Sequence, residues 1–207
     1  MEKVILASRN AGKIKEIEQI LSKYGMEVIS RDEAGLPPFE IEETGKTFEE
    51  NSYLKAKTIA DLCGEIVIAD DSGLEVDCIG GAPGVYSARF AGDGCTPADN
   101  NFKLLGLMKG IPQSERTARF VSVITMLFPD NTKLVARGEC EGYISEKLRG
   151  ENGFGYDPLF IPLGETRSFG EMNGEEKNAV SHRGRSLQKL EELICEQRKK
   201  ENERLYR

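Results

Sequence analysis

The stretch from residue 4 to residue 30, VILASRNAGKIKEIEQILSKYGMEVIS, predicts the fold class of this chain. Residues 4–7 form a short apolar run that is typical of a buried strand. Apolar side chains then recur at helical spacing, at Ile14, Ile17, Leu21 and Tyr24, and Gly25 is a typical helix stop. Residues 26–30 predict a second strand. The result is a strand–loop–helix–strand unit, in which the N-terminus of the helix faces any group that the loop at residues 8–13 binds.

The remaining pattern predicts one α/β domain over residues 1–207. Three further helices are expected: one from a capping box at Thr47 and Glu50 to Cys63, one after Thr96-Pro97 with an apolar stripe of Phe102, Leu105 and Met108, and one from Leu187. Short strands are expected at residues 66–69, 74–77 and 159–161, and a hairpin of two long strands at residues 119–128 and 133–144. Such βαβ units combined with a long hairpin are typical of a mixed twisted sheet flanked by helices.

Composition limits the class of partner. The chain carries 28 basic and 35 acidic residues, a formal net charge of −7, which disfavours nucleic acid and a membrane surface as partners. No apolar run approaches the roughly 18 residues of a membrane span. The five cysteines are widely spaced and form no CxxC motif, so reduced thiols and a cytoplasmic location are expected. An acidic protein that binds a polyphosphate needs local positive groups or a divalent cation.

The loop at residues 8–13 is the first candidate for an anion site. It lies between a strand and a helix N-terminus, where N–H groups and the helix dipole favour phosphate, and Lys13 adds a positive charge. It is not a Walker A loop, because Ile14 follows Gly12-Lys13 where that motif has Ser or Thr. From these residues alone, an ordinary turn with an exposed lysine remains an equal alternative.

Two acidic pairs are candidates for a metal site. Asp70-Asp71 follow an apolar strand directly, at the end of a strand where α/β proteins bind ligands. Adjacent carboxylates there are costly unless a cation or hydrogen-bond donors meet them, which favours a function over a solvated turn. Glu42-Glu43 also lie in a loop, where solvated side chains are the commoner arrangement. Mg²⁺ prefers a few carboxylates together with water and substrate phosphates.

Two later segments carry aromatic and basic groups. Residues 153–157 read GFGYD, a glycine-rich loop whose aromatic rings can stack on a base or plug the core. Residues 181–185 read SHRGR and contain the only histidine of the chain, with Lys177 before them. These donors can bind a base carbonyl or a phosphate, or can lie on the surface of a helix start. An anion cradle, an acidic pair, a stacking loop and a donor cluster together are the groups of a nucleotide site.

These segments, in their order along the chain, resemble the inosine triphosphate pyrophosphatase family. The resemblance rests on six motifs: residues 8–13, ETG at 43–45 with FEEN at 48–51, ADDSGL at 69–74, GAPGVYSAR at 81–89, GFGYD at 153–157 and SHRG at 181–184. It covers residues 3–195. Ser8-Arg9 is a departure, because the family usually has Thr-Gly or Thr-Asn there, and the bulkier Arg9 can alter phosphate contacts.

The resemblance implies an elongated two-lobed α/β fold, with a central mixed twisted sheet flanked by helices and an active-site cleft between the lobes. It also implies a homodimer with a contact near residues 80–89, and a requirement for Mg²⁺, which Mn²⁺ can replace. Glu43 and Asp71 would bind the metal, and the catalytic residues would be Asp71, Lys13 and Asp70. The implied substrate contacts are Ser8, Arg9, Asn10, Ala11, Gly12, Lys13, Lys55, Ser72, Phe154, Gly155, Tyr156, Asp157, Lys177, His182 and Arg183.

The implied reaction is hydrolysis of non-standard purine nucleoside triphosphates, such as ITP, dITP and XTP, to the monophosphate and pyrophosphate. The metal would neutralise charge on the leaving pyrophosphate. Asp71 would orient and deprotonate a water that attacks the α-phosphorus. Lys13 and the N–H groups beside it would stabilise the leaving group. Such an enzyme cleanses the nucleotide pool.

Two other functions stay open. A septum-inhibitor-type nucleotide pyrophosphatase would act on pyrimidine or modified nucleotides, but the segments at residues 153–157 and 181–183 favour a purine. A non-catalytic nucleotide sensor would need no activated water, so Glu43 and Asp70-Asp71 disfavour it.

Overall fold

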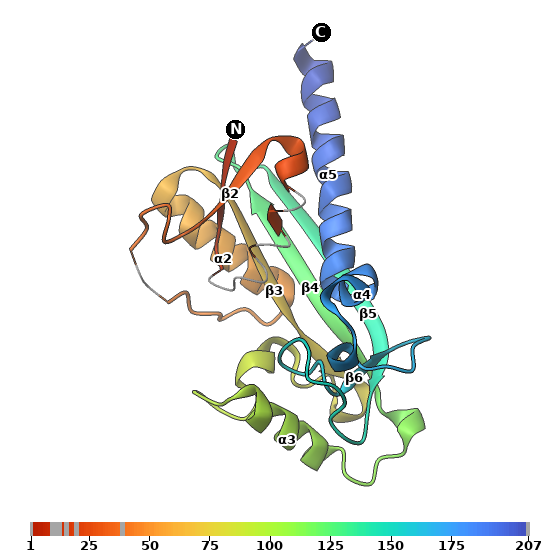
Figure 1. Ribbon diagram of the computed structural model, residues 1–207. Coiled ribbons are helices and arrows are strands. Elements are labelled where there is room, and N and C mark those ends of the chain that lie inside the picture. Colours follow the sequence, from red (N-terminus) through yellow and green to blue (C-terminus); the bar gives the residue numbers. More distant parts are fainter. Residues whose placement is uncertain (1, 9–13, 15–16, 19–20, 38–39, 206–207) are drawn as a thin grey trace. The chain divides into compact units, whose positions relative to one another are not determined.

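The computed structural model describes residues 2–8, 14, 17–18, 21–37 and 40–205, and its strands form a six-stranded sheet in the order β2-β1-β3-β4-β5-β6 (Figure 1). The strands are β1 (Glu2–Leu6), β2 (Met26–Ser30), β3 (Ile66–Val76), β4 (Thr117–Leu127), β5 (Lys133–Ile144) and β6 (Phe160–Pro162). β1 pairs in parallel with β2 and with β3, whereas β5 and β6 are antiparallel. The expected mixed sheet and the two long strands β4 and β5 are therefore confirmed.

Each α-helix of the described residues begins where a side chain accepts a backbone N–H of the first turn. They are α2 (Phe48–Cys63), α3 (Pro97–Leu107), α4 (Gly174–Val180) and α5 (His182–Leu205), with the short 3-10 turns η1 (Ser22–Tyr24), η2 (Asp77–Ile79), η3 (Gly84–Arg89), η4 (Gln113–Glu115) and η5 (Phe169–Glu171). Thr47 caps α2 by accepting the Glu50 N–H at 3.1 Å. The Glu50 carboxylate accepts the N–H of Lys46, so the predicted box at Thr47 is only half formed. Thr96 and Asp99 form a complete capping box at the start of α3.

The predicted helix between β1 and β2 lies partly outside the described residues. Ile14, Ile17 and Leu21 belong to its described part and are helical. Ile17 and Leu21 are buried, as their helical spacing predicts. Gly25, with a φ of 69°, closes the η1 turn that follows, and this is the stop that the sequence predicts.

The chain divides into two compact units. Unit 1 consists of Met1–Asp71, Val123–Arg137 and Ser186–Arg207, and unit 2 of Ser72–Ser122 and Gly138–Arg185. β3, β4 and β5 each contribute residues to both units. All five cysteines are free thiols, as expected. In the part of the chain that the structure describes, no helix combines the length and the apolar character of a membrane span. A single domain with two lobes and a cleft between them stays a prediction.

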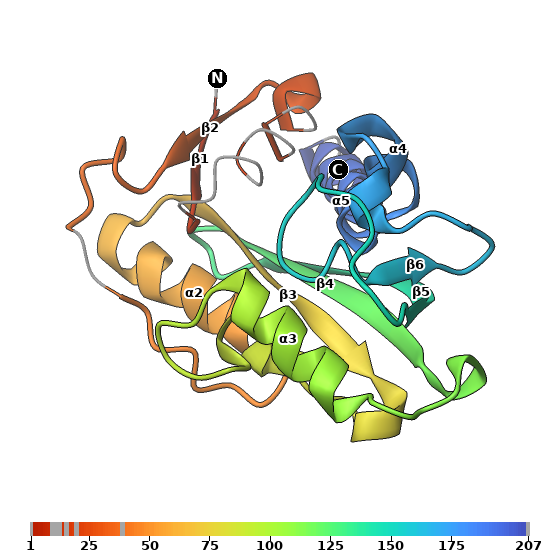
Figure 2. The same ribbon diagram turned by 60° about the horizontal axis from the view of Figure 1, so that its bottom comes forward.

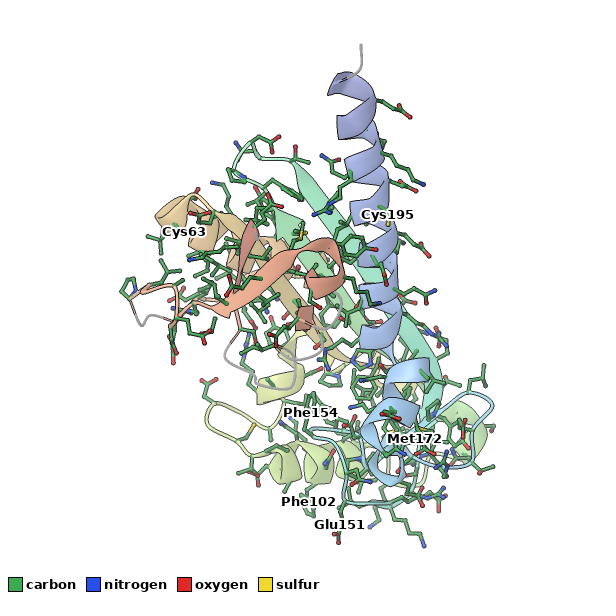
Figure 3. All side chains as sticks on the ribbon, turned by 45° about the horizontal axis from the view of Figure 1, so that its top comes forward. Cys63, Phe102, Glu151, Phe154, Met172 and Cys195 are labelled. Carbon is green, nitrogen blue, oxygen red and sulfur yellow. The ribbon has the colours of Figure 1, made fainter. Side chains whose placement is uncertain are left out.

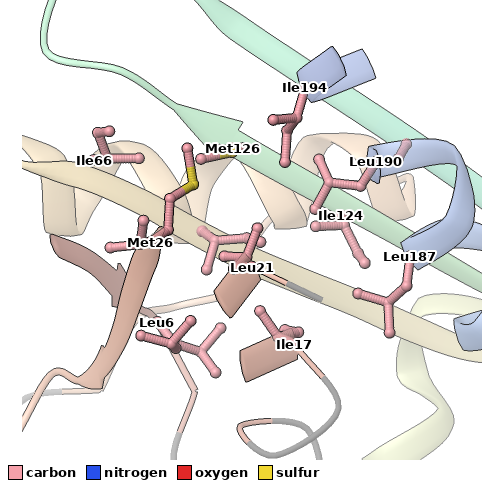
Figure 4. Packing of buried hydrophobic residues seen from close by; sticks show 14 residues of the cluster. Leu6, Ile17, Leu21, Met26, Ile66, Ile124, Met126, Leu187, Leu190 and Ile194 are labelled. Atoms are coloured by element: carbon pink, nitrogen blue, oxygen red, sulfur yellow. The ribbon is translucent and has the colours of Figure 1, made fainter. Parts of the chain in front are cut away.

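A different helix covers each face of the sheet in unit 1. Alternate residues of a strand point to opposite faces. Ile68 of β3 belongs to an apolar cluster with α5, whereas Ala69 belongs to a cluster with α2. Figure 4 shows Leu187, Leu190 and Ile194 of α5 in the first cluster. The same alternation places Asp70 on the α5 face and Asp71 on the α2 face. Two adjacent carboxylates therefore lie in different surroundings.

The expected loop at residues 70–73 is wrong, because these residues belong to β3. The strand runs without a break from Ile66 to Val76, so Asp70 and Asp71 lie within a strand. β3 also pairs with β4, and this backbone pairing with a neighbouring strand outweighs the turn tendency of Asp, Ser and Gly. The last paired residues of β1 and β3 are Leu6 and Ile68. Asp70 and Asp71 therefore lie on the part of β3 that extends beyond the carboxyl end of β1.

Unit 2 has its own core, formed where α3 packs on the sheet (Figure 2). Leu104 and Met108 pack there with Leu74 of β3 and Phe120 of β4. Phe102 does not belong to the buried stripe, contrary to the sequence prediction, because 82% of it is exposed on the outer side of α3 (Figure 3). Positions four apart share one helix face, and the pair at 104 and 108 faces the sheet.

Candidate active site

Asp71 of β3, Lys55 of α2 and Glu43 form a charged cluster in unit 1. The Lys55 ammonium donates to Asp71 Oδ1 at 2.7 Å and to Glu43 Oε1 at 2.9 Å. The side chains of Lys55 and Asp71 are only 12% and 9% exposed. Three residues that are well separated in the sequence, and that were predicted to bind metal or substrate, are therefore in contact.

The segment before α2 is held to that helix by Asn51. Its Oδ1 accepts the N–H of Gly45 at 2.8 Å. A Cβ at position 45 would lie 2.6 Å from this oxygen, so the approach requires glycine. Asn51 and Lys55 are four residues apart and share one face of α2. The contact at Gly45 therefore brings Glu43 to the face of α2 that carries Lys55.

The cluster is short of positive charge. Burial raises the pKa of the Asp71 carboxyl; Lys55 opposes this shift, and the carboxylates of Glu43 and Asp70 add to it. Burial also disfavours the charged form of Lys55, but Asp71 and Glu43 outweigh it and raise the pKa of this lysine. The ammonium is thus held in its charged form, yet it does not balance the acids around it.

A divalent cation fits this cluster. Asp71 Oδ2 is buried and has no hydrogen-bond partner among the described residues, and such an oxygen costs free energy until a donor or a cation meets it. Among the residues that the structure describes, no three His, Cys, Asp or Glu side chains form a ready metal cage. Mg²⁺ does not need one, because it keeps waters and substrate phosphates beside one or two carboxylates. Glu43 and Asp71 are the residues that could hold it.

Asp157 organises the aromatic loop of unit 2. Its Oδ2 accepts the N–H of Phe154 at 2.7 Å and a proton of the Lys177 ammonium at 2.6 Å. Only 3% of the Asp157 side chain is exposed. Asn101 of α3 donates to the carbonyl of Gly155 at 2.9 Å. The loop is therefore held from both sides, by α4 through Lys177 and by α3 through Asn101.

Phe154 presents a half-exposed ring at the tip of this loop (Figure 3). The Lys177 ammonium lies 4.8 Å and the Arg183 guanidinium carbon 5.7 Å from the ring centroid. Cations at such distances are attracted to the face of an aromatic ring. Tyr156 differs, because it is buried and its hydroxyl donates to the Ser87 carbonyl at 2.9 Å. Phe154 is the ring available to a ligand, and Tyr156 ties the loop to the core.

Gly153→Ala is expected to destabilise the protein by roughly 3 kcal/mol, because the change strains the backbone and displaces a buried carboxylate. Gly153 has a φ of 76°, and a Cβ there would collide with Asp157 Oδ2. Gly155→Ala is the matched control, since Gly155 has a φ of 61° but open space at its Cβ. Thermal unfolding of both variants measures the difference. Equal losses would show that the contact with Asp157 does not constrain the loop.

The donor cluster lies at the start of α5, which begins before the expected position at Leu187. Ser181 is the reason, because its Oγ accepts a backbone N–H of the first turn at 3.1 Å and caps the helix. His182 and Arg183 are each only 4% exposed. The His182 ring stacks on Phe120, with centroids 4.7 Å apart and 12° between the planes. Both predicted base contacts are therefore buried groups rather than surface side chains.

Part of the predicted anion loop lies outside the described residues. The predicted residues outside the described part of the chain are Arg9, Asn10, Ala11, Gly12 and Lys13. Ser8 follows β1, and Ser72 follows Asp71 in β3; both are half-buried. Their expected contacts with the substrate stay predictions.

Asn51 and Asn101 hold loops of the site, and the sequence analysis assigned a role to neither of them. Both lie within helices and are buried, with 0% and 6% of their surface exposed. Asparagine is a poor helix former, because its side chain competes for backbone hydrogen bonds. An asparagine inside a helical pattern is therefore a usable signal for a side chain that holds a neighbouring loop.

Comparison with known proteins gives consistent matches over nearly the whole chain. The sequence profile of the Ham1 family matches residues 4–193. A dITP/XTP pyrophosphatase of Desulforamulus reducens is 49% identical over 193 residues, covering 93% of this chain and 95% of that protein. A dITP/XTP pyrophosphatase of Clostridium perfringens is 50% identical over 200 residues, covering 94% and 98%. The solved structure of the Staphylococcus aureus Ham1 protein matches with a TM-score of 0.87 at 39% identity, covering 95% of this chain and 100% of that one.

Proposed function

The chain belongs to the Ham1 family, and on that premise we propose that it hydrolyses non-standard purine nucleoside triphosphates, dITP, XTP and ITP, to the monophosphate and pyrophosphate. The observation that carries this proposal is the buried cluster in which Lys55 joins Glu43 and Asp71. Relatives named dITP/XTP pyrophosphatases match this chain over almost their full length. The protein is accordingly a hydrolase of triphosphate anhydride bonds.

Mg²⁺ is the proposed cofactor, and Mn²⁺ is expected to replace it. Glu43 and Asp71 would hold the ion through carboxylate oxygens, and Asp71 Oδ2 accepts no hydrogen bond from the residues that the structure describes. When bound, the ion supplies neutralisation of the charge that develops on the leaving phosphates. The shortage of positive charge in the cluster supports this choice of cofactor.

Asp71 is the proposed proton acceptor for the attacking water. Lys55 holds its Oδ1, so the direction of the carboxylate is set before substrate binds. Burial, reinforced by Glu43 and Asp70, raises the pKa of Asp71, and a raised pKa makes a carboxylate a stronger base. Asp70 points to the other face of β3, so its proposed part is electrostatic. Lys13, outside the described residues, is the proposed partner of the leaving pyrophosphate.

Unit 2 supplies the proposed base contacts. Phe154 offers a ring face on which a purine can stack, and stacking accepts any base. His182 and Arg183 are donors suited to the oxygen at C6 of hypoxanthine and xanthine, where adenine carries an amino group. Asp157 and Lys177 hold the loop that carries Phe154, so their proposed part is mainly to position this ring.

Hydrolysis in ¹⁸O-labelled water is expected to place the label in the monophosphate. Water that attacks the α-phosphorus leaves its oxygen there, and the β- and γ-phosphates depart together as unlabelled pyrophosphate. The measurement is mass spectrometry of both products after incubation of the full-length protein with Mg²⁺ and dITP.

Label in orthophosphate would mean attack at the γ-phosphorus and would contradict the proposal. Parallel reactions with dUTP and dATP separate the alternatives that the sequence leaves open. A septum-inhibitor-type enzyme would prefer pyrimidine or modified nucleotides over dITP. A nucleotide sensor would bind dITP and release no product.

A homodimer and a cytoplasmic location complete the proposal. The dimer contact is expected near residues 80–89, and within this segment 57% of Tyr86 is exposed. Exposed aromatic side chains are enriched at protein interfaces, which supports this position.

A further inference from the structure

Lys55 is hydrogen-bonded to the two carboxylates that a divalent cation would use. Its ammonium is hydrogen-bonded to Asp71 Oδ1 at 2.7 Å and to Glu43 Oε1 at 2.9 Å. The same two residues are the proposed metal ligands. A compact ammonium and a divalent cation both bind anionic oxygen, so they compete for this pair of side chains.

The contacts of helix α2 keep the Lys55 ammonium beside Glu43 and Asp71. Asn51, one turn before Lys55, holds the segment that precedes α2. Ser52 Oγ lies 2.6 Å from Thr125 Oγ1, a buried contact between α2 and β4. Only 12% of the Lys55 side chain is exposed, so solvent and salt screen its charge weakly. Lys55 is thus a fixed, largely buried part of the cluster, unlike a lysine that forms an exposed ion pair at the surface.

The carboxylate of Asp71 is divided between two uses. Its Oδ1 accepts a hydrogen bond from the Lys55 ammonium, while its Oδ2 is buried and has no hydrogen-bond partner within the described part of the chain. A cation that meets Oδ2 comes within a few ångströms of the ammonium on Oδ1. Two positive charges at that separation repel strongly in a partly buried site.

We propose that Lys55 is a positioning residue that lowers the affinity of the cluster for a free divalent cation and so couples metal binding to nucleotide binding. The ammonium keeps Glu43 and Asp71 together when no phosphate is near. The triphosphate brings its own negative charges, which offer the ammonium other partners and attract the cation at the same time. This inference rests on the proposed function of the same carboxylates.

Mn²⁺ titration of the full-length protein without nucleotide tests the proposal. We expect Lys55→Met to bind Mn²⁺ at least about tenfold more tightly than the unchanged protein, because a repelling charge a few ångströms away is removed. Lys55→Arg keeps the charge and is expected to bind Mn²⁺ within about threefold of the unchanged protein. Lys57→Met is the matched control, because it removes an ammonium from the same helix where Lys57 pairs with Asp61 at the surface.

The coupling to nucleotide is measured by repeating the titration with the α,β-methylene analogue of dITP. The analogue is expected to tighten Mn²⁺ binding less in Lys55→Met than in the unchanged protein, because linkage makes the two ligands share one coupling free energy. Unchanged or weaker Mn²⁺ affinity in Lys55→Met without nucleotide would overturn the proposal. An equal gain in Lys57→Met would also overturn it, because net charge would then explain the effect.

If Lys55→Met is less stable than the unchanged protein, its Tm measured with and without Mn²⁺ still tests the proposal. The variant leaves two carboxylates without their ammonium, so Mn²⁺ is expected to raise its Tm more than that of the unchanged protein. A loss of stability that Mn²⁺ does not restore contradicts the proposal. The ¹⁸O experiment uses the unchanged protein and is independent of these titrations, so each result can fail without the other.

Discussion

Asp71→Asn is expected to lower the rate of dITP hydrolysis at least about 100-fold, the usual scale for the loss of a general base. Asparagine keeps the shape of the side chain, but it cannot take up a proton and brings no charge to a metal. The change also removes the anionic partner of Lys55, which lies 2.7 Å from Asp71 Oδ1. Pyrophosphate release under steady-state conditions, with saturating Mg²⁺, measures the effect.

Asp61→Asn is the control for this experiment. Asp61 is also an aspartate of unit 1, but it pairs with Lys57 at the surface of α2, where an ion pair contributes little. Its replacement is expected to leave the rate unchanged. Mn²⁺ titration of Asp71→Asn separates loss of the metal from loss of the base. If this variant binds Mn²⁺ and still hydrolyses dITP at a near-normal rate, Asp71 is not the proton acceptor.

Replacement of both His182 and Arg183 by alanine is expected to lower dITP turnover heavily and dATP turnover little. Adenine presents a donor where hypoxanthine presents an acceptor, so it offers these donors no acceptor, and a site built around such donors can discriminate by about 10⁴-fold. Both side chains are nearly buried, which is the condition for a large penalty. The ratio of kcat/KM for dITP to that for dATP is therefore expected to narrow by at least about 100-fold.

Phe154→Ala separates stacking from base choice. Because stacking accepts any purine, this variant is expected to weaken dITP and dATP hydrolysis alike. His182 also stacks on Phe120 at 4.7 Å, so the Tm of the double variant must be compared with that of Phe154→Ala. If kcat/KM for dITP and for dATP fall by the same factor in the double variant, His182 and Arg183 bind phosphate or support the core. The base-reading role would then be wrong.

Local signals predicted several element boundaries correctly. β2 has the expected bounds, Met26–Ser30. α2 ends at Cys63, and Gly64 follows with a φ of 66°, as a glycine stop predicts. The Thr96 cap at the start of α3 is also confirmed. In these cases the energy that decides the boundary comes from residues within one or two turns, so it can be read from the sequence.

Predictions failed where distant partners decided the outcome. Asp70 and Asp71 have turn-forming side chains, but pairing of β3 with β4 keeps them in a strand. Phe102 is apolar at helical spacing, yet α3 turns Leu104 toward the sheet and leaves Phe102 exposed. Helical periodicity identifies a stripe, but only the shape of the opposing surface selects which face of the helix is buried.

The sequence by itself determined the residue types of the candidate site and the local elements that carry them, because motif order, caps and strand patterns depend on near neighbours. Only the tertiary structure decided which of these residues meet. It placed Lys55 between Glu43 and Asp71, turned Asp70 to the opposite face of β3, and used Asp157 to hold the loop of Phe154. The physical reason is that burial and charge act between side chains far apart in the chain, so their partners exist only once the helix and the strand are packed together.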